Sequence, residues 1–87
     1  MSSREEPRYS LFAFYRGGLN SATDKAIEKA AKRTSDGNGM SLSDGERDLS
    51  FSFFRKNTAE AAARRVQDIK GVRVELRDIK ENKDISI

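Results

Sequence analysis

The stretch Met40–Phe53, with the sequence MSLSDGERDLSFSF, decides the fold that this chain of 87 residues is expected to adopt. Apolar and polar residues alternate on both sides of Asp44-Gly45-Glu46, and such alternation is typical of strands with one buried face. An Asp-Gly pair between two alternating segments is a strong hairpin signal. The sequence therefore predicts strands at residues 40–43 and 48–53, joined by a tight turn.

Two elements are predicted before this hairpin. Residues 9–15, YSLFAFY, are rich in aromatic residues and are bounded by a proline and a glycine pair, which predicts a strand. A helix is expected to begin at Asn20 or Ser21, where Ser21 and Asp24 resemble a capping box. Its apolar residues share one helical face and precede a loop at residues 34–39; they are Ala22, Ala26, Ile27, Ala30 and Ala31.

Two more elements follow the hairpin. A second helix is expected to begin at Asn57 or Thr58 and to end before Gly71. Its apolar residues fit the i, i+3, i+4, i+7 pattern; they are Ala59, Ala62, Ala63, Val66 and Ile69. Residues 72–77, VRVELR, alternate strictly and predict a half-exposed strand, and residues 84–87 indicate one further edge strand.

The order strand, helix, strand, strand, helix, strand favours an α+β ferredoxin-like fold, the split βαβ plait. In this βαββαβ fold, two helices cover one face of a four-stranded antiparallel sheet, which residues 84–87 would extend as a C-terminal edge strand. We expect a single α+β domain at residues 8–79, a flexible tail at residues 1–7, and a C-terminal tail or short edge strand at residues 80–87.

The composition argues against catalysis. The chain has no cysteine and no histidine, so it lacks the usual thiol nucleophiles, metal ligands and proton shuttles of neutral pH. Four acidic residues near the hairpin match no calcium-binding loop and are interpreted as turn residues; they are Asp36, Asp44, Glu46 and Asp48. We therefore expect a non-enzymatic protein with no catalytic residue, no metal site and no cofactor.

Charge and hydropathy indicate the setting in which the protein works. No apolar run approaches the ~20 residues that span a bilayer, and residues 1–7 lack the apolar segment of a secretory signal. We therefore expect a cytoplasmic protein with no membrane association. The 17 basic and 14 acidic residues give a net charge of +3, which permits binding to a polyanion without requiring it.

The first candidate site is an anion site in the segments that follow the first and third strands. These strands are expected to be parallel neighbours, so that both helix starts would meet at one edge of the sheet. Free backbone N–H groups would then lie beside basic side chains, which suits phosphate or another anion. The candidate residues are Arg16, Gly17, Gly18, Asn20, Ser21, Arg55, Lys56, Asn57 and Thr58. The alternative is that they form only turns and caps.

The second candidate site is the sheet face that the helices leave uncovered. If the serines of the strands point outward, this face carries Phe12, Phe14, Ser50, Ser52, Phe54, Arg73 and Arg77. With the opposite orientation of the first strand, Tyr9, Leu11, Ala13 and Tyr15 would be exposed instead. Either orientation leaves an apolar patch, which monomers rarely leave unused. The alternative is that a loop or the C-terminal segment covers the patch.

Two functions are compatible with these sites. The first is a small binding or regulatory protein that acts by protein–protein interaction, on another protein or on itself as a homodimer. Inhibitors and accessory factors carried by phages and mobile elements are of this kind. The alternative is a nucleic-acid- or phosphate-binding module that uses the basic edge at the two helix starts. The two functions differ in their salt dependence, because binding to nucleic acid weakens steeply with salt.

Overall fold

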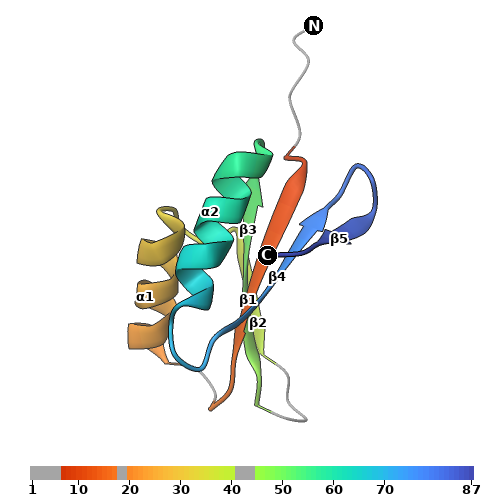
Figure 1. Ribbon diagram of the computed structural model, residues 1–87. Helices are drawn as coiled ribbons and strands as arrows, with labels where there is room; N and C mark the ends of the chain where they lie inside the picture. The colour runs from red at the N-terminus through yellow and green to blue at the C-terminus, as the bar shows by residue number, and fades with distance from the viewer. Residues whose placement is uncertain (1–6, 18–19, 41–44) are drawn as a thin grey trace, which may run out of the picture.

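The computed structural model describes residues 7–17, 20–40 and 45–87, which form an α+β structure (Figure 1). Its helices and strands follow one another in the order βαββαββ. The elements are β1 (Tyr9–Tyr15), α1 (Ser21–Ala31), β2 (Gly37–Met40), β3 (Arg47–Phe53), α2 (Lys56–Gln67), β4 (Arg73–Asp78) and β5 (Lys83–Ile85). Neither helix in these ranges is long and apolar enough to cross a membrane.

The strands form one antiparallel sheet in the order β2-β3-β1-β4-β5, and both helices pack on the same face of it (Figure 1). The predicted α+β class, with two helices on an antiparallel sheet, is confirmed. The sheet has five strands rather than four. The additional strand forms at the chain's C-terminal side, where Ile85 pairs with Leu76 of β4, close to the segment that the sequence indicated.

The relative direction of β1 and β3 was predicted wrongly. The two strands are neighbours but antiparallel, with Tyr9 opposite Phe53 and Tyr15 opposite Arg47. The connections explain this direction. The crossover through α1 makes β2 parallel to β1, and the hairpin that follows reverses the chain, so β3 runs against β1. The carboxyl ends of β1 and β3 therefore lie at opposite ends of the sheet.

The hydrophobic core lies between the sheet and the helices. In β1 and β3 every second side chain is buried; these are Tyr9, Leu11, Ala13, Tyr15, Leu49, Phe51 and Phe53. The buried residues of α2 are Ala59, Ala62, Ala63 and Val66, as the apolar spacing predicted. In α1 only Ile27 and Ala31 are buried, whereas Ala22 and Ala26 are exposed. The small side chains of α2 let its backbone approach the sheet, where Phe51 and Phe53 fill the space.

The helix starts differ in detail from the predictions. Asn20 caps α1, because its side-chain oxygen accepts hydrogen bonds from two backbone N–H groups of the first turn at 3.0 and 3.1 Å. Asp24 is not part of a capping box, since its carboxylate bonds to side chains of β1 and β3. The second helix begins at Lys56, so Asn57 and Thr58 lie in its first turn rather than at its cap.

The partner of β3 in the hairpin begins earlier than predicted. Strand β2 occupies residues 37–40, within the glycine-rich segment interpreted as a loop, and pairs with β3 as an antiparallel neighbour. Gly39 lies opposite Asp48, and a Cβ atom on Gly39 would be 2.7 Å from the Asp48 Oδ1 atom. Glycine is therefore the residue that permits this close approach. Residues 41–44, including most of the predicted first strand of the hairpin, lie outside the described residues, as do residues 1–6 of the predicted tail.

Candidate binding surface on the open sheet face

The sheet face away from the helices carries every second side chain of the three central strands. Leu11 and Ala13 are fully buried on the helix side, so Phe12 and Phe14 point to the open face. The orientation of β1 that the sequence left undecided is thus the one that places the serines outward. The open face carries Ser10, Phe12, Phe14, Asp48, Ser50, Ser52, Arg73, Glu75 and Arg77. Phe54, which was predicted on this face, follows the end of β3 and is 52% exposed.

Pairing between the strands arranges these side chains in three rows across the sheet. The first row is Asp48, Phe14 and Arg73; the second is Ser50, Phe12 and Glu75; the third is Ser52, Ser10 and Arg77. In each row the β3 residue is short and the β4 residue is long. The glycines of β2 continue this gradient, since Gly39 lies opposite Asp48 and Gly37 opposite Ser50. Side chains therefore project less far from the open face over β2 and β3 than over β4.

An aromatic pair forms the middle of the open face. The rings of Phe12 and Phe14 are stacked, with 6.4 Å between their centroids and 26° between their planes, and both are half-buried. The guanidinium carbon of Arg73 lies 4.3 Å from the centroid of the Phe14 ring. Arg73 also forms ion pairs with Glu75 and Glu46, at 2.5 and 3.4 Å. Aromatic and arginine side chains of this kind are enriched in protein interfaces.

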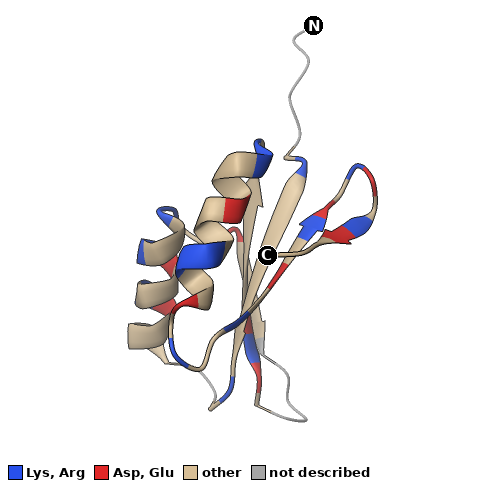
Figure 2. Ribbon diagram, viewed as in Figure 1, with Lys and Arg blue, Asp and Glu red and all other residues tan. Residues whose placement is uncertain are grey.

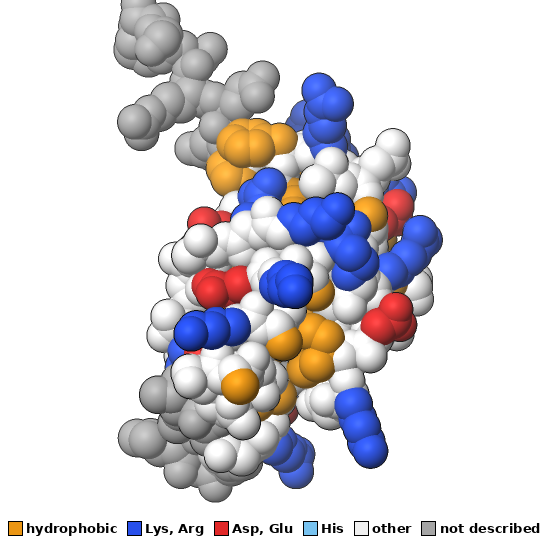
Figure 3. Space-filling view, turned by 90° about the vertical axis from the view of Figure 1, so that its left-hand side faces the viewer, with side chains coloured by type: hydrophobic (Ala, Val, Ile, Leu, Met, Phe, Trp, Pro, Cys, Tyr) orange, Lys and Arg blue, Asp and Glu red, His pale blue; other side chains and the backbone are white. Residues whose placement is uncertain are grey.

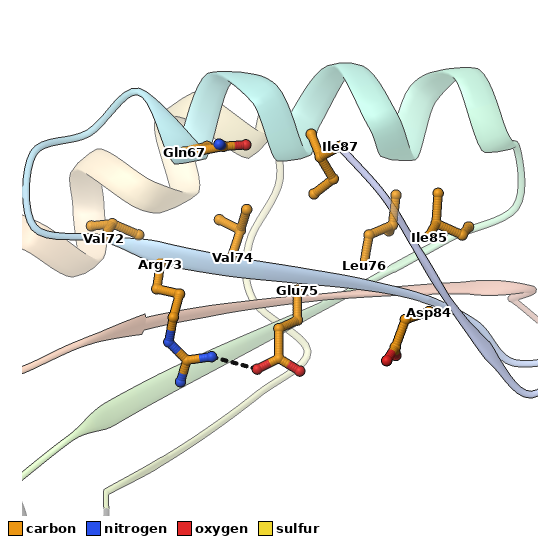
Figure 4. Close-up of a pocket in the computed structure, with 9 residues that line it drawn as sticks. All are labelled: Gln67, Val72, Arg73, Val74, Glu75, Leu76, Asp84, Ile85 and Ile87. Carbon is orange, nitrogen blue, oxygen red and sulfur yellow. Dashed lines mark hydrogen bonds and ion pairs between the residues drawn. The ribbon is translucent and has the colours of Figure 1, made fainter.

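The C-terminal segment does not cover this aromatic pair. Strand β5 extends the sheet at the β4 edge, and Ile87 lies on the α2 side of β4 (Figure 4). In the same view Arg73, Glu75 and Asp84 point away from α2, to the open side. The alternative in which this segment folds over the apolar patch is therefore wrong. Among the described residues, Phe12 and Phe14 are covered only by their neighbours in the sheet.

A shallow hollow lies on the opposite side of β4, between this strand, β5 and the last turn of α2 (Figure 4). It has a volume of about 640 Å³. Its lining combines aliphatic residues, Val72, Val74, Leu76, Ile85 and Ile87, with polar ones, Gln67, Arg73, Glu75 and Asp84. It arises because β4 and β5 extend beyond the part of the sheet that α2 covers. Within the described ranges it contains no cluster of charged groups directed at its centre.

The predicted anion site is not assembled. Because β1 and β3 are antiparallel, Arg16 and Gly17 lie at the end of the sheet beside Arg47, whereas Arg55 and Lys56 lie at the other end. A seven-residue strand separates them, a length of roughly 20 Å. Arg16 and Gly17 lead to Asn20 and Ser21 at the start of α1, and Arg55 and Lys56 lead to Asn57 and Thr58 in α2. The two helix N-termini therefore lie at opposite ends of the sheet and do not form one site. Gly18 lies outside the described residues.

A group that the sequence analysis missed surrounds Asp24. Its carboxylate accepts hydrogen bonds from the Tyr15 hydroxyl at 2.5 Å, from the Arg47 Nε at 3.0 Å and from a terminal Arg47 nitrogen at 2.9 Å. Burial acts to raise the pKa of Asp24, but the hydrogen bonds from Arg47 and Tyr15 outweigh it and hold the pKa below its usual range. Burial, together with the hydrogen bond to Asp24, raises the pKa of Tyr15. The group joins β1, α1 and β3, and we interpret it as structural.

A second carboxylate, Asp78, joins the start of β1 to the end of β4. It is 5% exposed and accepts two hydrogen bonds from the Arg8 guanidinium, at 3.2 and 3.1 Å. The backbone N–H of Glu81 donates a third, at 3.2 Å, in the turn toward β5. The hydrogen bond from Arg8 is the main reason that the pKa of Asp78 lies below its usual range. In the sequence, Asp78 is the first residue beyond the predicted strand, and no local pattern marks it as paired.

The outer face of the helices is rich in cations (Figures 2 and 3). Lys25, Lys29, Lys32 and Arg64 are among those that form no ion pair within the described residues. Two others bind within the chain. Arg65 donates to the Ala30 carbonyl at 2.6 Å, and Arg33 donates to the Ser52 carbonyl and lies 4.1 Å from the centroid of the Phe53 ring. The acidic side chains of α1 are occupied, since Asp24 bonds to Arg47 and Glu28 to Ser35.

In the described part of the chain, the acidic residues near the hairpin do not form a cluster. The Asp36 carboxylate accepts a hydrogen bond from the Ser52 backbone N–H at 2.6 Å, and Glu46 pairs with Arg73. Asp44 lies outside the described residues. Across the described ranges, no group of three or more acidic side chains is placed to hold a metal ion.

Comparison of the chain with protein-family models, with curated proteins and with solved structures finds no match. Functional inference therefore depends on the geometry of the two sheet faces and the helix layer.

Proposed function

We propose that this chain is a small non-enzymatic binding protein with a ferredoxin-like plait, and that its open sheet face docks onto another polypeptide chain. The fold proposal is supported by the order β4-β1-β3-β2 within the sheet, with one helix in each crossover. Strand β5 is then an addition at one edge. A regulatory role, as an inhibitor or accessory factor, suits a protein that acts by docking.

The observation that carries the proposal is the half-buried Phe12–Phe14 pair at the centre of the sheet, over which no helix or strand of the described residues packs. Two phenylalanine rings on the central strand gain free energy when water is excluded from them. A polar rim surrounds them, formed by the serines of β3 and the charged side chains of β4. An apolar centre with a polar rim is the usual anatomy of a protein interface.

The same face is less suited to single-stranded nucleic acid. Stacking of bases on an open sheet of this kind uses aromatic side chains on both central strands. Here β1 offers Phe12 and Phe14, but the open side of β3 offers Asp48, Ser50 and Ser52. The carboxylate of Asp48 beside the aromatic pair would also repel a phosphate backbone.

Absence of catalysis is supported by chemistry rather than by the lack of a ligand. The sequence contains no histidine or cysteine, and the two most strongly bonded carboxylates, Asp24 and Asp78, are bound to arginines of the same chain. Carboxylates with lowered pKa values are poor general acids near neutral pH. The charged residues that line the hollow beside β4, Arg73, Glu75 and Asp84, point away from α2 (Figure 4).

Site-specific photo-cross-linking in the native host tests the proposal. A photoreactive residue at the rim of the open face, Ser52→benzoylphenylalanine, is expected to cross-link to a polypeptide, and Phe14→Asp in the same chain is expected to abolish the product. The matched control is Lys25→benzoylphenylalanine on the helix face. Cross-linking that comes from position 25 alone, or that Phe14→Asp does not change, would contradict the proposal.

Polyanion binding by the helix layer is a second candidate. It is favoured by helix cations such as Lys25 and Lys29, which form no ion pair within the described residues and lie on the same helix as acidic groups that are already bonded. If it is correct, an oligonucleotide binds at low salt, and the logarithm of the binding constant falls linearly with the logarithm of salt concentration. Lys25→Glu with Lys29→Glu should then reduce the slope. Lys83→Glu, on β5, is the control. Undetectable binding at low salt would remove this candidate.

A further inference from the structure

The open sheet face is asymmetric about β1 in both charge and height. On the β3 side, Asp48 is half-buried and forms no ion pair or side-chain hydrogen bond within the described residues. On the β4 side, Arg73 lies in the same row, separated from Asp48 by Phe14. Strands are spaced by about 4.8 Å, so the two residues stand roughly 10 Å apart. Among the described residues, no cation of the same chain is therefore paired with Asp48.

We propose that the occupant of this face is a second copy of the chain, packed face to face about a two-fold axis that runs parallel to β1. The inference rests on the proposed docking function of the open face and names its partner. Such an axis places β3 of one copy over β4 of the other. Asp48 of each copy then faces Arg73 of the second copy, and the aromatic pairs meet at the axis.

The heights of the side chains favour the same axis. Packed sheets keep a nearly constant spacing of about 10 Å, so a high strip must meet a low one. The high strip is β4, with Arg73, Glu75 and Arg77, and the low strip is β3 with β2, where Gly37 and Gly39 carry no side chain. An axis parallel to β1 packs the long side chains of β4 against the short side chains of β3 and β2 of the other copy, and it does so twice.

A two-fold axis that lies in the sheet plane but runs across the strands neither pairs Asp48 with a cation nor matches long side chains with short ones. It would place β3 on β3 and β4 on β4. The open side of β3 carries only Asp48, Ser50 and Ser52, so Asp48 would still face no cation. The long side chains of the two β4 strands would collide, while the two β3 strands would leave a gap. Charge and shape therefore select one symmetric arrangement.

Two charge reversals test the arrangement by complementation. Sedimentation of the wild type is expected to show a dimer at micromolar concentration. Asp48→Arg and Arg73→Asp should each raise the Kd of self-association at least about tenfold, because each reversal sets like charges opposite one another twice. An equimolar mixture of the two variants should form a heterodimer, since the arginine introduced at position 48 of one chain then faces the aspartate introduced at position 73 of the other. Complementation in the mixture also shows that both variants are folded. Lys25→Asp on the helix face is the control and should leave the Kd unchanged.

The outcomes separate this inference from the function on which it rests. A wild type that stays monomeric at high micromolar concentration, or variants that dimerise as the wild type does, would overturn the homodimer. If Ser52→benzoylphenylalanine then cross-links to a different polypeptide in a manner that Phe14→Asp abolishes, the docking function stands without self-association. If cross-links come only from position 25, both are wrong. Variants that weaken the dimer but do not complement each other would overturn the two-fold axis along β1.

Discussion

The Tyr15 hydroxyl lies 2.5 Å from the Oδ1 atom of Asp24 and donates a hydrogen bond to it. Tyr15 ends β1, and Asp24 lies in the first turn of α1, so the bond closes the connection between strand and helix. The same hydroxyl accepts a hydrogen bond from the backbone N–H of Asn20 at 3.0 Å, and Arg47 of β3 binds the carboxylate from the other side. One carboxylate thus links the consecutive elements β1 and α1 to β3, whose Arg47 is 23 residues away in the sequence.

Replacement of this carboxylate should destabilise the fold. Asp24→Asn removes the charge that Arg47 binds, and both side chains are largely shielded from solvent, with 16% and 12% of their surface exposed. We expect the free energy of unfolding to fall by about 1–3 kcal/mol, since the arginine is left without its anionic acceptor. Urea denaturation measures the change. Asp68→Asn, at the exposed C-terminal end of α2, is the control and should stay within about 0.5 kcal/mol of wild type.

The lowered pKa values of Asp24 and Asp78 predict sensitivity to acid. Each carboxyl has a lower pKa in the folded chain than in the unfolded one, so folding is favoured while the group is ionised. The stabilisation is complete above about pH 5, where the unfolded chain is also ionised, and is lost as the pH falls through the folded-state values. Free energies of unfolding between pH 7 and pH 2 should show this loss. The decline should be shallower for Asp24→Asn and for Asp78→Asn, and an unchanged decline in both would contradict the prediction.

The raised pKa of Tyr15 predicts the opposite behaviour in alkali. The folded chain holds the phenolic proton more tightly than the unfolded chain, so the stabilisation is present below about pH 10 and is lost as the pH rises through the folded-state value. The chain has two tyrosines and no tryptophan, so absorbance at the phenolate band is simple to assign. In a Tyr9→Phe variant, Tyr15 should ionise above the range of a free tyrosine, and urea should return it to that range.

The sequence was sufficient to predict secondary structure where side chains alternate strictly or repeat at helical spacing. The bounds of β1 and the presence of the two helices follow from such patterns, because burial of one face imposes them. The composition of the open face could also be predicted once its serines were assumed to point outward. Phe12 and Phe14 are on that face as the pattern indicated.

The position of β2, the partners of Asp24 and the direction of β3 depend on contacts between distant segments, which no local sequence pattern predicts. Strand β2 lies in a glycine-rich segment because its neighbours, Asp48 and Ser50, lean over the glycines. Asp24 looks like a capping residue until Arg47 is brought to it from a distance of 23 residues. The direction of β3 depends on the number of chain reversals through α1 and the hairpin. The expected parallel direction brought the two halves of the predicted anion site together, whereas the antiparallel direction places them at opposite ends of the sheet.

A glycine with a left-handed backbone gives a test of local strain. Gly71, in the turn before β4, has a φ of +83°, and no atom lies within 4 Å of the position that a Cβ would occupy. Gly71→Ala therefore adds no collision, and its cost is conformational. We expect a loss of about 1 kcal/mol for alanine and a smaller loss for Gly71→Asn, because asparagine tolerates this region better. Thermal unfolding of the two variants distinguishes them, and equal stability would contradict the prediction.

The same substitution at two adjacent residues of β1 should destabilise the fold to very different extents. Leu11 is fully buried against the helices, whereas Phe12 is half-buried on the open face. Leu11→Asp places a carboxylate in the core without a partner, so we expect a loss of about 4 kcal/mol or more and failure to fold in a domain of this size. Phe12→Asp leaves its carboxylate in contact with water, so the chain should remain folded and lose about 1 kcal/mol. Far-UV circular dichroism and urea denaturation at low protein concentration, where self-association does not contribute, compare the two. Because the side chains differ by one position on one strand, a folded Leu11→Asp chain beside an unfolded Phe12→Asp chain would reverse the assignment of the faces, and with it the docking surface.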